Sequence, residues 1–142
     1  MRRSIMSPPM PCGSYFEALD GAPSLTGRTP REKGSIHRAE LEPLDAISAY
    51  FHNATPGLGP DVEIYQSAEW GCRQRDKALK GIHYFDGILK SHSSPARRSM
   101  ADITIIGSLI FAGLVELPVP AECEALRAWY ATMRSAPASG TG

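Results

Sequence analysis

The side chains that could hold a metal or act as nucleophiles are few and widely spaced. The four histidines are His37, His52, His83 and His92, and the three cysteines are Cys12, Cys72 and Cys123. They include no HExxH motif, no pair of histidines one helical turn apart and no CxxC pair. Zinc sites and disulfide frameworks are usually built on such spacings. We therefore expect no metal, no resident cofactor and no disulfide, and we expect the chain to work in the reducing cytoplasm.

The motifs of nucleophilic and phosphate-binding sites do not occur in the sequence either. Ser108 sits in an apolar run without the second glycine of a GxSxG motif. The Gly57-Leu58-Gly59 segment lacks the third glycine of a dinucleotide-binding loop, and there is no GxxxxGK[ST] loop. Cys72 and Cys123 fall on the apolar faces of expected helices, where a thiol is normally unreactive. We therefore predict no catalytic residue from these motifs.

Charge and hydropathy disfavour two kinds of partner. The 142 residues hold 15 Lys+Arg and 15 Asp+Glu, a formal net charge of zero. Domains that bind nucleic acid usually carry an excess of cations. The most apolar stretch, residues 103–117, is shorter than the roughly 20 residues that cross a bilayer and contains polar side chains. We expect neither nucleic acid nor a membrane as a partner.

The spacing of apolar residues predicts an all-α fold, whose first helix begins at Pro30. Thr29 can cap this helix, and Glu32 stands where it completes a capping box. Apolar residues three and four apart then mark the inner face, namely Leu41, Leu44, Ile47 and Phe51. Pro43 interrupts the stretch, and we expect a bend there because proline removes one backbone hydrogen bond.

Two further amphipathic helices are predicted on either side of residues 99–115. The first runs from Pro60 to about Lys90. Its expected buried face comprises Val62, Tyr65, Ala68, Cys72, Leu79, Ile82, Phe85 and Leu89. The other carries Cys123, Leu126, Trp129, Tyr130 and Met133 at helical spacing. The aromatic residues of these helices could pack in a core or line a pocket for an apolar ligand.

Residues 99–115 have the pattern of a central helix. Ser99 and Asp102 form a capping signature immediately before the apolar run 103–115. Because that run is apolar around its whole circumference, we expect it to be the most buried element of a bundle. Gly107 and Gly113 would let neighbouring helices approach it closely.

This part of the chain carries a family resemblance. Ser99-Met100-Ala101-Asp102-Ile103-Thr104, an apolar helix, a Pro-x-Pro break and Leu126-x-x-Trp129 follow in order. The arrangement resembles the C-terminal helical domain of glutathione S-transferases. In the division that this resemblance implies, residues 15–29 hold a helix end and an interdomain linker, and 30–135 form the helical domain. We expect residues 1–14 to be disordered and 136–142 to be a loose tail.

The resemblance implies a binding function for the helices and assigns them no catalytic residue. In the family, a preceding thioredoxin-like domain binds the co-substrate glutathione and supplies the catalytic residue. The helical domain supplies an apolar wall for the second substrate and part of a dimer interface. The corresponding wall residues here are His37, Leu41, Leu44, Ile106 and Ile110. We expect a chain that binds an apolar small molecule, or a second copy or helical partner, and is inactive alone.

Two alternatives remain open from the sequence. One is a non-catalytic helical module for protein interaction, and the other is a translated remnant without function.

Overall fold

The computed structural model describes residues 26–91 and 100–135, and all regular structure within these ranges is helical. The elements are α2 (Pro30–Ala39), the π-helical turn η1 (Glu40–Leu44), α3 (Asp45–Ala54), α4 (Ala68–Ser91), α5 (Met100–Leu114) and α6 (Glu124–Ser135). The predicted all-α fold is confirmed. The expectations for residues 1–14 and 136–142, and for the helix end within 15–25, lie outside the described residues.

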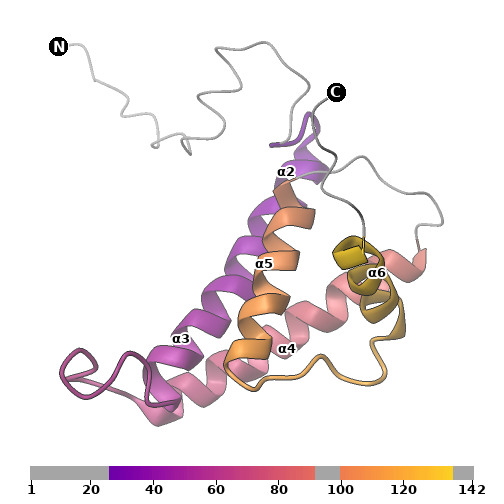
Figure 1. Cartoon of the computed structure of the whole chain (residues 1–142). Coiled ribbons are helices and arrows are strands. Elements are labelled where there is room, and N and C mark those ends of the chain that lie inside the picture. The colour runs from indigo at the N-terminus through magenta and orange to yellow at the C-terminus, as the bar shows by residue number, and fades with distance from the viewer. Residues whose placement is uncertain (1–25, 92–99, 136–142) are drawn as a thin grey trace, which may run out of the picture.

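The helices pack as crossed layers (Figure 1). α5 runs beside α2 and η1, while α4 packs against α3 on one side and α6 on the other. One core cluster joins α4, α5 and α6 through buried residues such as Ile82, Leu109 and Leu126. A second joins α3, α4 and the end of α5.

The predicted capping box at the start of α2 is present. The Thr29 hydroxyl accepts a hydrogen bond from the Glu32 N–H at 3.2 Å, and the Glu32 carboxylate accepts one from the Thr29 N–H at 3.2 Å. Both bonds satisfy backbone N–H groups that have no partner inside the helix. Helix α2 therefore begins where the local sequence predicts it.

We expect Thr29→Ala to lower the free energy of unfolding by about 0.5–2 kcal/mol, the usual cost of losing a cap. Urea denaturation followed by circular dichroism measures the change. Thr132→Ala is the control, because among the described residues the exposed Thr132 hydroxyl only donates to the Ala128 carbonyl one turn back in α6. Equal losses in the two variants would show that the cap contributes nothing specific.

Pro43 is accommodated by a change of helix type. It lies inside η1, and the N–H of Asp45 donates to the carbonyl of Glu40, five residues back. A π-helical turn holds one extra residue and thereby absorbs the position where proline cannot donate. α2, η1 and α3 follow one another without an intervening loop.

The predicted start of the next helix at Pro60 is wrong. Residues 55–67, hereafter the α3–α4 loop, are not helical, and α4 begins at Ala68. Of the expected buried face, Val62 is 60% and Tyr65 93% exposed, and Cys72 is also exposed. Gly59, with φ +103°, instead closes a tight turn through its carbonyl.

Long-range hydrogen bonds hold the α3–α4 loop. Glu63 contacts His52 at 2.6 Å and accepts from the Leu58 N–H at 3.1 Å. The hydrogen bond from His52, and then that from Leu58, lowers the pKa of the Glu63 carboxyl. The Gln66 amide donates to the carbonyls of His52 and Thr55 at 2.9 and 2.8 Å. These bonds to α3 favour a loop where the acids Asp61 and Glu63 suggested a helix.

Helix α5 is buried on one face only, so the expectation of an element covered on all sides is not met by the described residues. Ile105, Ser108, Leu109 and Ala112 are buried. On the opposite face Ile103, Ile110 and Leu114 are 54%, 51% and 77% exposed. The buried Ser108 lies at a helix contact, as expected, and donates to the Thr104 carbonyl at 2.7 Å.

The close helix contacts are not at Gly107 and Gly113, where an added Cβ would meet nothing within 4 Å in the described structure. They are on α4. A Cβ at Gly71 would lie 2.6 Å from the Ala54 Cβ, and one at Gly81 would lie 2.9 Å from the Glu42 Cβ. α4 therefore supplies the small residues that bring α3 and η1 close to it.

Candidate functional site

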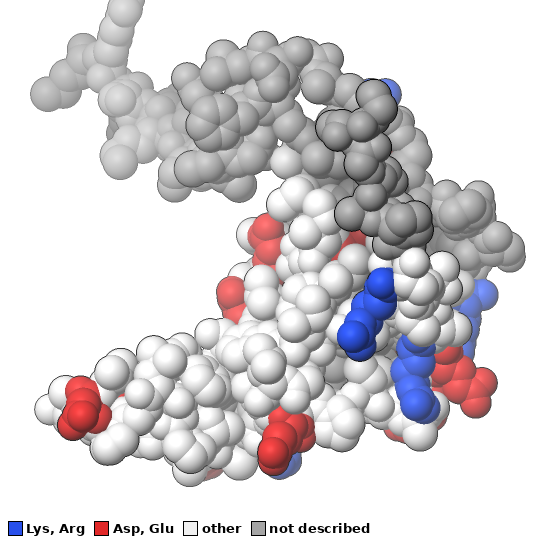
Figure 2. Space-filling view, in the orientation of Figure 1, with Lys and Arg blue, Asp and Glu red and all other residues white. Residues whose placement is uncertain are grey.

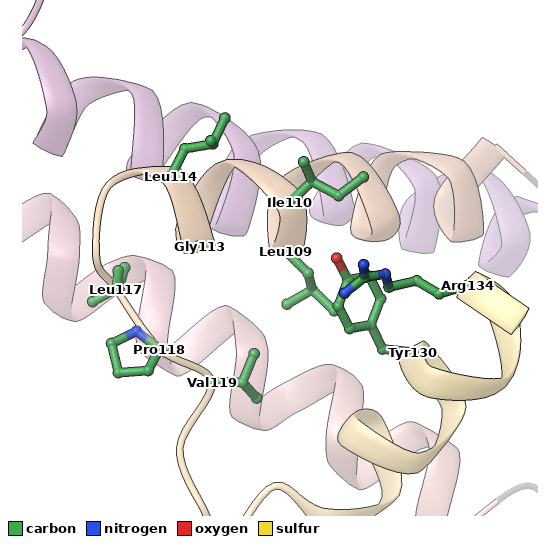
Figure 3. A pocket seen from close by; sticks show the side chains of 9 residues that line it. All are labelled: Leu109, Ile110, Gly113, Leu114, Leu117, Pro118, Val119, Tyr130 and Arg134. Atoms are coloured by element: carbon green, nitrogen blue, oxygen red, sulfur yellow. The ribbon is translucent and has the colours of Figure 1, made fainter.

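An apolar hollow opens between α5 and α6 (Figure 3). Its volume is about 510 Å³. The lining residues are Leu109, Ile110, Gly113, Leu114, Leu117, Pro118, Val119, Tyr130 and Arg134. Apolar side chains thus form most of the wall, while the Tyr130 hydroxyl and the Arg134 guanidinium supply the polar groups on the α6 side.

The turn after α5 shapes one end of this hollow. The Leu117 N–H donates to the Ala112 carbonyl at 2.8 Å, and the Glu116 N–H to the Gly113 carbonyl at 3.3 Å. Glu116 has φ +56°. This pair of bonds is the Schellman arrangement that ends many helices, with glutamate at the position where glycine is usual. It turns Leu117 inward, where it is only 7% exposed.

A buried carboxylate holds the other side of the hollow in place. Asp86 of α4 is 4% exposed and accepts a hydrogen bond from the Leu126 N–H of α6 at 2.9 Å. Its other oxygen lies 2.6 Å from the Lys90 ammonium. Burial opposes the charged form, but the bonds from Lys90 and Leu126 outweigh it and lower the pKa of Asp86. An ionised Asp86 thus caps α6 from a neighbouring helix.

Cys123 and His83 form the one contact of the described residues that looks like a nucleophile beside a base. The Cys123 sulfur lies 3.3 Å from Nδ1 of His83, whose Nε2 lies 3.6 Å from Glu122. However, Cys123 is fully buried. Burial first, and then the charges of Asp86 and Glu122, raise the pKa of its thiol. The expected inert thiol fits this geometry, since a reactive cysteine needs access and a stabilised thiolate.

No group of three or more His, Cys, Asp or Glu side chains among the described residues could hold a metal ion. No helix in the described ranges is both long and apolar enough to span a membrane.

Comparison with known proteins identifies the architecture. No protein-family model matches the chain. It is 63% identical over 129 residues to "Glutathione S-transferase 2" of Saccharomyces cerevisiae. The crystal structure of Gtt2 from the same yeast superposes with a TM-score of 0.76 at 62% identity over 87% of this chain. The chain is a partial homologue of the glutathione S-transferases.

A second solved structure agrees with this assignment. The glutathione S-transferase domain-containing protein of Marinobacter aquaeolei VT8 matches with a TM-score of 0.76 and 35% identity over 89% of this chain. The chain spans 55% of the curated yeast relative, and 62% and 66% of the two solved chains. It is therefore shorter than the family members it resembles.

The five residues predicted as the second-substrate wall lie on α2, η1 and α5, which pack together. The His37 side chain is 70% exposed and lies 3.5 Å from Glu40. Leu41 is 43% exposed, and Leu44 and Ile106 are half-buried. Of the five, Ile110 lines the hollow described above. Their role in binding stays a prediction.

The predicted cap of α5 is half described. Asp102 lies in the first turn of the helix and is half-buried, whereas Ser99 is outside the described residues.

The sequence patterns did not predict the hollow between α5 and α6. The sequence allowed Tyr130 either in the core or in a pocket. For Arg134 it indicated only a cation in the last turn of a helix, where the helix dipole favours positive charge.

Proposed function

We propose that these helices act as the apolar half of a glutathione transferase site and that the 142 residues alone do not conjugate glutathione. The identity to the yeast transferase supports the family role. The observation that supports the wall is that the five predicted wall residues lie on α2, η1 and α5, which pack together, with Leu41 43% and Ile110 51% exposed. Apolar surface of this kind on a helix usually marks a binding surface. In the view of Figure 2, charged side chains stand apart on the described part of the molecule, with uncharged surface between them.

The chemistry of conjugation supports the second half of the proposal. The glutathione thiol needs a group within roughly 2.6–3.2 Å of its sulfur to stabilise the thiolate. In the family that group lies in the thioredoxin-like domain, and all regular structure of the described residues here is helical. An apolar wall holds an electrophile, but it cannot lower the pKa of a thiol.

Binding of an apolar electrophile tests the wall. We expect Leu41→Asp or Ile106→Asp to weaken binding of a chlorinated aromatic by about tenfold, since a carboxylate next to an apolar ligand loses solvation. Leu58→Asp is the matched control, because Leu58 is 63% exposed on the α3–α4 loop. Nuclear magnetic resonance titration gives the dissociation constants. An equal loss in all three variants would contradict the assignment of the wall.

A non-catalytic interaction module is the second candidate function, and the α3–α4 loop favours it. Leu58, Val62, Ile64 and Tyr65 are 63%, 60%, 70% and 93% exposed. Glu63 accepts a hydrogen bond from the Leu58 N–H, and the Gln66 amide donates to the His52 carbonyl. These bonds fix the loop backbone while the four apolar side chains stay exposed. Several exposed apolar side chains on a loop whose backbone is held in place are typical of protein interfaces.

Self-association is the simplest test of that surface. If a second copy covers it, light scattering will show a dimer that Ile64→Ser combined with Tyr65→Ser converts to a monomer. A wild-type chain that stays monomeric, and a double variant that behaves identically, would argue against a homodimer through this loop.

A further inference from the structure

We propose that the His52–Glu63 pair is a latch for the tip of the α3–α4 loop, residues 57–63, and that protonation of Glu63 releases this tip while the helices stay folded. A released tip no longer presents Leu58 and Val62 in fixed positions. The latch would therefore regulate the loop surface named above as the second candidate function, and its consequence for binding rests on that function.

One carboxylate oxygen joins the loop tip to α3. Oε1 of Glu63 lies 2.6 Å from Nδ1 of His52 and accepts a hydrogen bond from the Leu58 N–H at 3.1 Å. The Glu63 side chain is only 11% exposed. Gly57 leaves room for it, because a Cβ at Gly57 would lie 2.8 Å from Cδ of Glu63. The tip thus closes around a single carboxylate whose partner belongs to a packed helix.

The other hydrogen bonds printed for the tip are local. The N–H groups of Val62 and Glu63 both donate to the Gly59 carbonyl, at 3.1 and 2.9 Å. The Gly59 N–H donates to the Pro56 carbonyl at 3.0 Å. Isolated turns of this length are marginal in water, because few bonds offset the lost backbone entropy. The tip therefore depends on Glu63 for its attachment to α3.

The end of the loop next to α4 is attached by groups that do not titrate. The Gln66 amide donates to the carbonyls of His52 and Thr55, and the Ser67 N–H donates to the Asn53 side chain at 3.1 Å. Amide groups keep the same charge between roughly pH 3 and 7. Protonation of Glu63 consequently frees the tip and leaves residues 66–67 bonded to α3.

Few other charges act on this pair. His52 faces Glu63 from α3, and Asp61 is an exposed acid of the loop itself. At the start of α4, Glu69 and Arg73 are exposed and pair with each other at 2.7 Å. The His52 ring can donate from Nδ1 in its charged form and in one neutral form, so the charge of Glu63 controls the latch.

The direction of the pH dependence follows from which form of Glu63 is bonded. The carboxylate accepts both hydrogen bonds, and these bonds, that from His52 first, lower the pKa of Glu63 in the folded chain. The latch is therefore fully closed above the unfolded pKa of about 4.3 and opens as the pH falls through the lower folded pKa.

Amide hydrogen exchange of the 142-residue chain, followed by nuclear magnetic resonance at pH 6, tests the latch. All chains carry Ile64→Ser and Tyr65→Ser, so that a second copy on the loop surface cannot protect the tip. We expect Glu63→Gln to lower the protection factor of the Leu58 N–H by at least about fivefold, because the neutral amide replaces a charged acceptor. The Ser67 N–H is the internal control and should be unchanged.

Variants of the partner separate the latch from a general loosening. We expect His52→Phe to lower the protection of the Leu58 N–H as Glu63→Gln does. His52→Asn keeps a donor near the position of Nδ1 and should restore most of it. His37→Phe is the matched control, because His37 also pairs with a carboxylate, that of Glu40, but on α2.

The acid limb tests control by protonation. The protection of the Leu58 N–H in the chain with Glu63 should converge on that of Glu63→Gln as the pH falls below about 4. A difference that stays constant from pH 6 to pH 3 would overturn this control.

Unchanged protection of the Leu58 N–H in Glu63→Gln, or an equal loss at the Ser67 N–H, would overturn the latch itself. These outcomes are distinguishable from failure of the loop interface. A wild-type chain that light scattering shows to be monomeric argues against a homodimer, whereas the exchange data still decide whether Glu63 holds the tip.

Discussion

Asp86→Ala will lower the free energy of unfolding by about 2–3 kcal/mol, because it leaves the Leu126 N–H without its buried acceptor. The loss includes the ion pair with Lys90, whose ammonium lies 2.6 Å from the carboxylate. Asp76→Ala on the same helix is the control. Asp76 is exposed and pairs only with its neighbour Arg75 among the described residues, so we expect a change within about 0.5 kcal/mol. Chemical denaturation at pH 7 compares the two variants.

The same carboxylate predicts a pH dependence. Its pKa is lower in the folded chain than in the unfolded chain. Its stabilising contribution is therefore complete above the unfolded pKa of about 3.9 and is lost as the pH falls through the lower folded pKa. The stability difference between the wild type and Asp86→Asn should shrink progressively below about pH 4. A difference that stays constant down to pH 2 would mean that Asp86 is not ionised in the folded protein.

Gly71→Ala will destabilise the fold by about 1–3 kcal/mol, although alanine is the better helix former. The new Cβ would lie 2.6 Å from the Ala54 Cβ and 2.8 Å from the Ala54 backbone nitrogen. A backbone atom cannot rotate away, so α3 and α4 must separate at this contact. Melting temperatures followed by circular dichroism report the effect.

Gly87→Ala is the matched control for Gly71→Ala. The chemical change and the helix are the same, but a Cβ at Gly87 would meet nothing within 4 Å. We expect this variant to be more stable by about 0.5–1 kcal/mol, which is the propensity difference between the two residues. Stabilisation by both substitutions would refute the close packing of α3 on α4.

The contrast between the two glycines shows what the sequence alone could not provide. The capping box at Thr29 was predictable because its partners lie within four residues of one another. The apolar run 103–115 indicated Gly107 and Gly113 as contact points, yet the contacts fall at Gly71 and Gly81. Which glycine faces a neighbouring helix depends on how each helix is rotated about its axis. The spacing of apolar residues along the sequence does not determine this rotation.

The predicted start of α4 at Pro60 was wrong for a related reason. Pro60 followed by acids is a good local signal for a helix, but Ser67 lies at the actual start and accepts from the Trp70 N–H at 3.4 Å. Its own N–H donates to the side chain of Asn53, fourteen residues earlier. Such tertiary hydrogen bonds compete with local helix propensity. A prediction made from one local segment of the sequence does not include them.

The hollow between α5 and α6 was less predictable than the fold. The resemblance to glutathione S-transferases pointed to α2 and α5 for ligand contacts. The hollow instead combines α5 with the turn at Leu117 and with Tyr130 and Arg134 of α6. That combination depends on the left-handed residue Glu116 and on the Asp86–Leu126 bond between distant elements.

We propose that the 142 residues provide an apolar wall without the means to activate glutathione. The most direct test is the rate of glutathione conjugation to a model aromatic halide by the purified chain at neutral pH, measured against the uncatalysed rate. We expect the two rates to be equal at every glutathione concentration. Glutathione-dependent turnover that saturates and scales with the amount of the chain would contradict the claim.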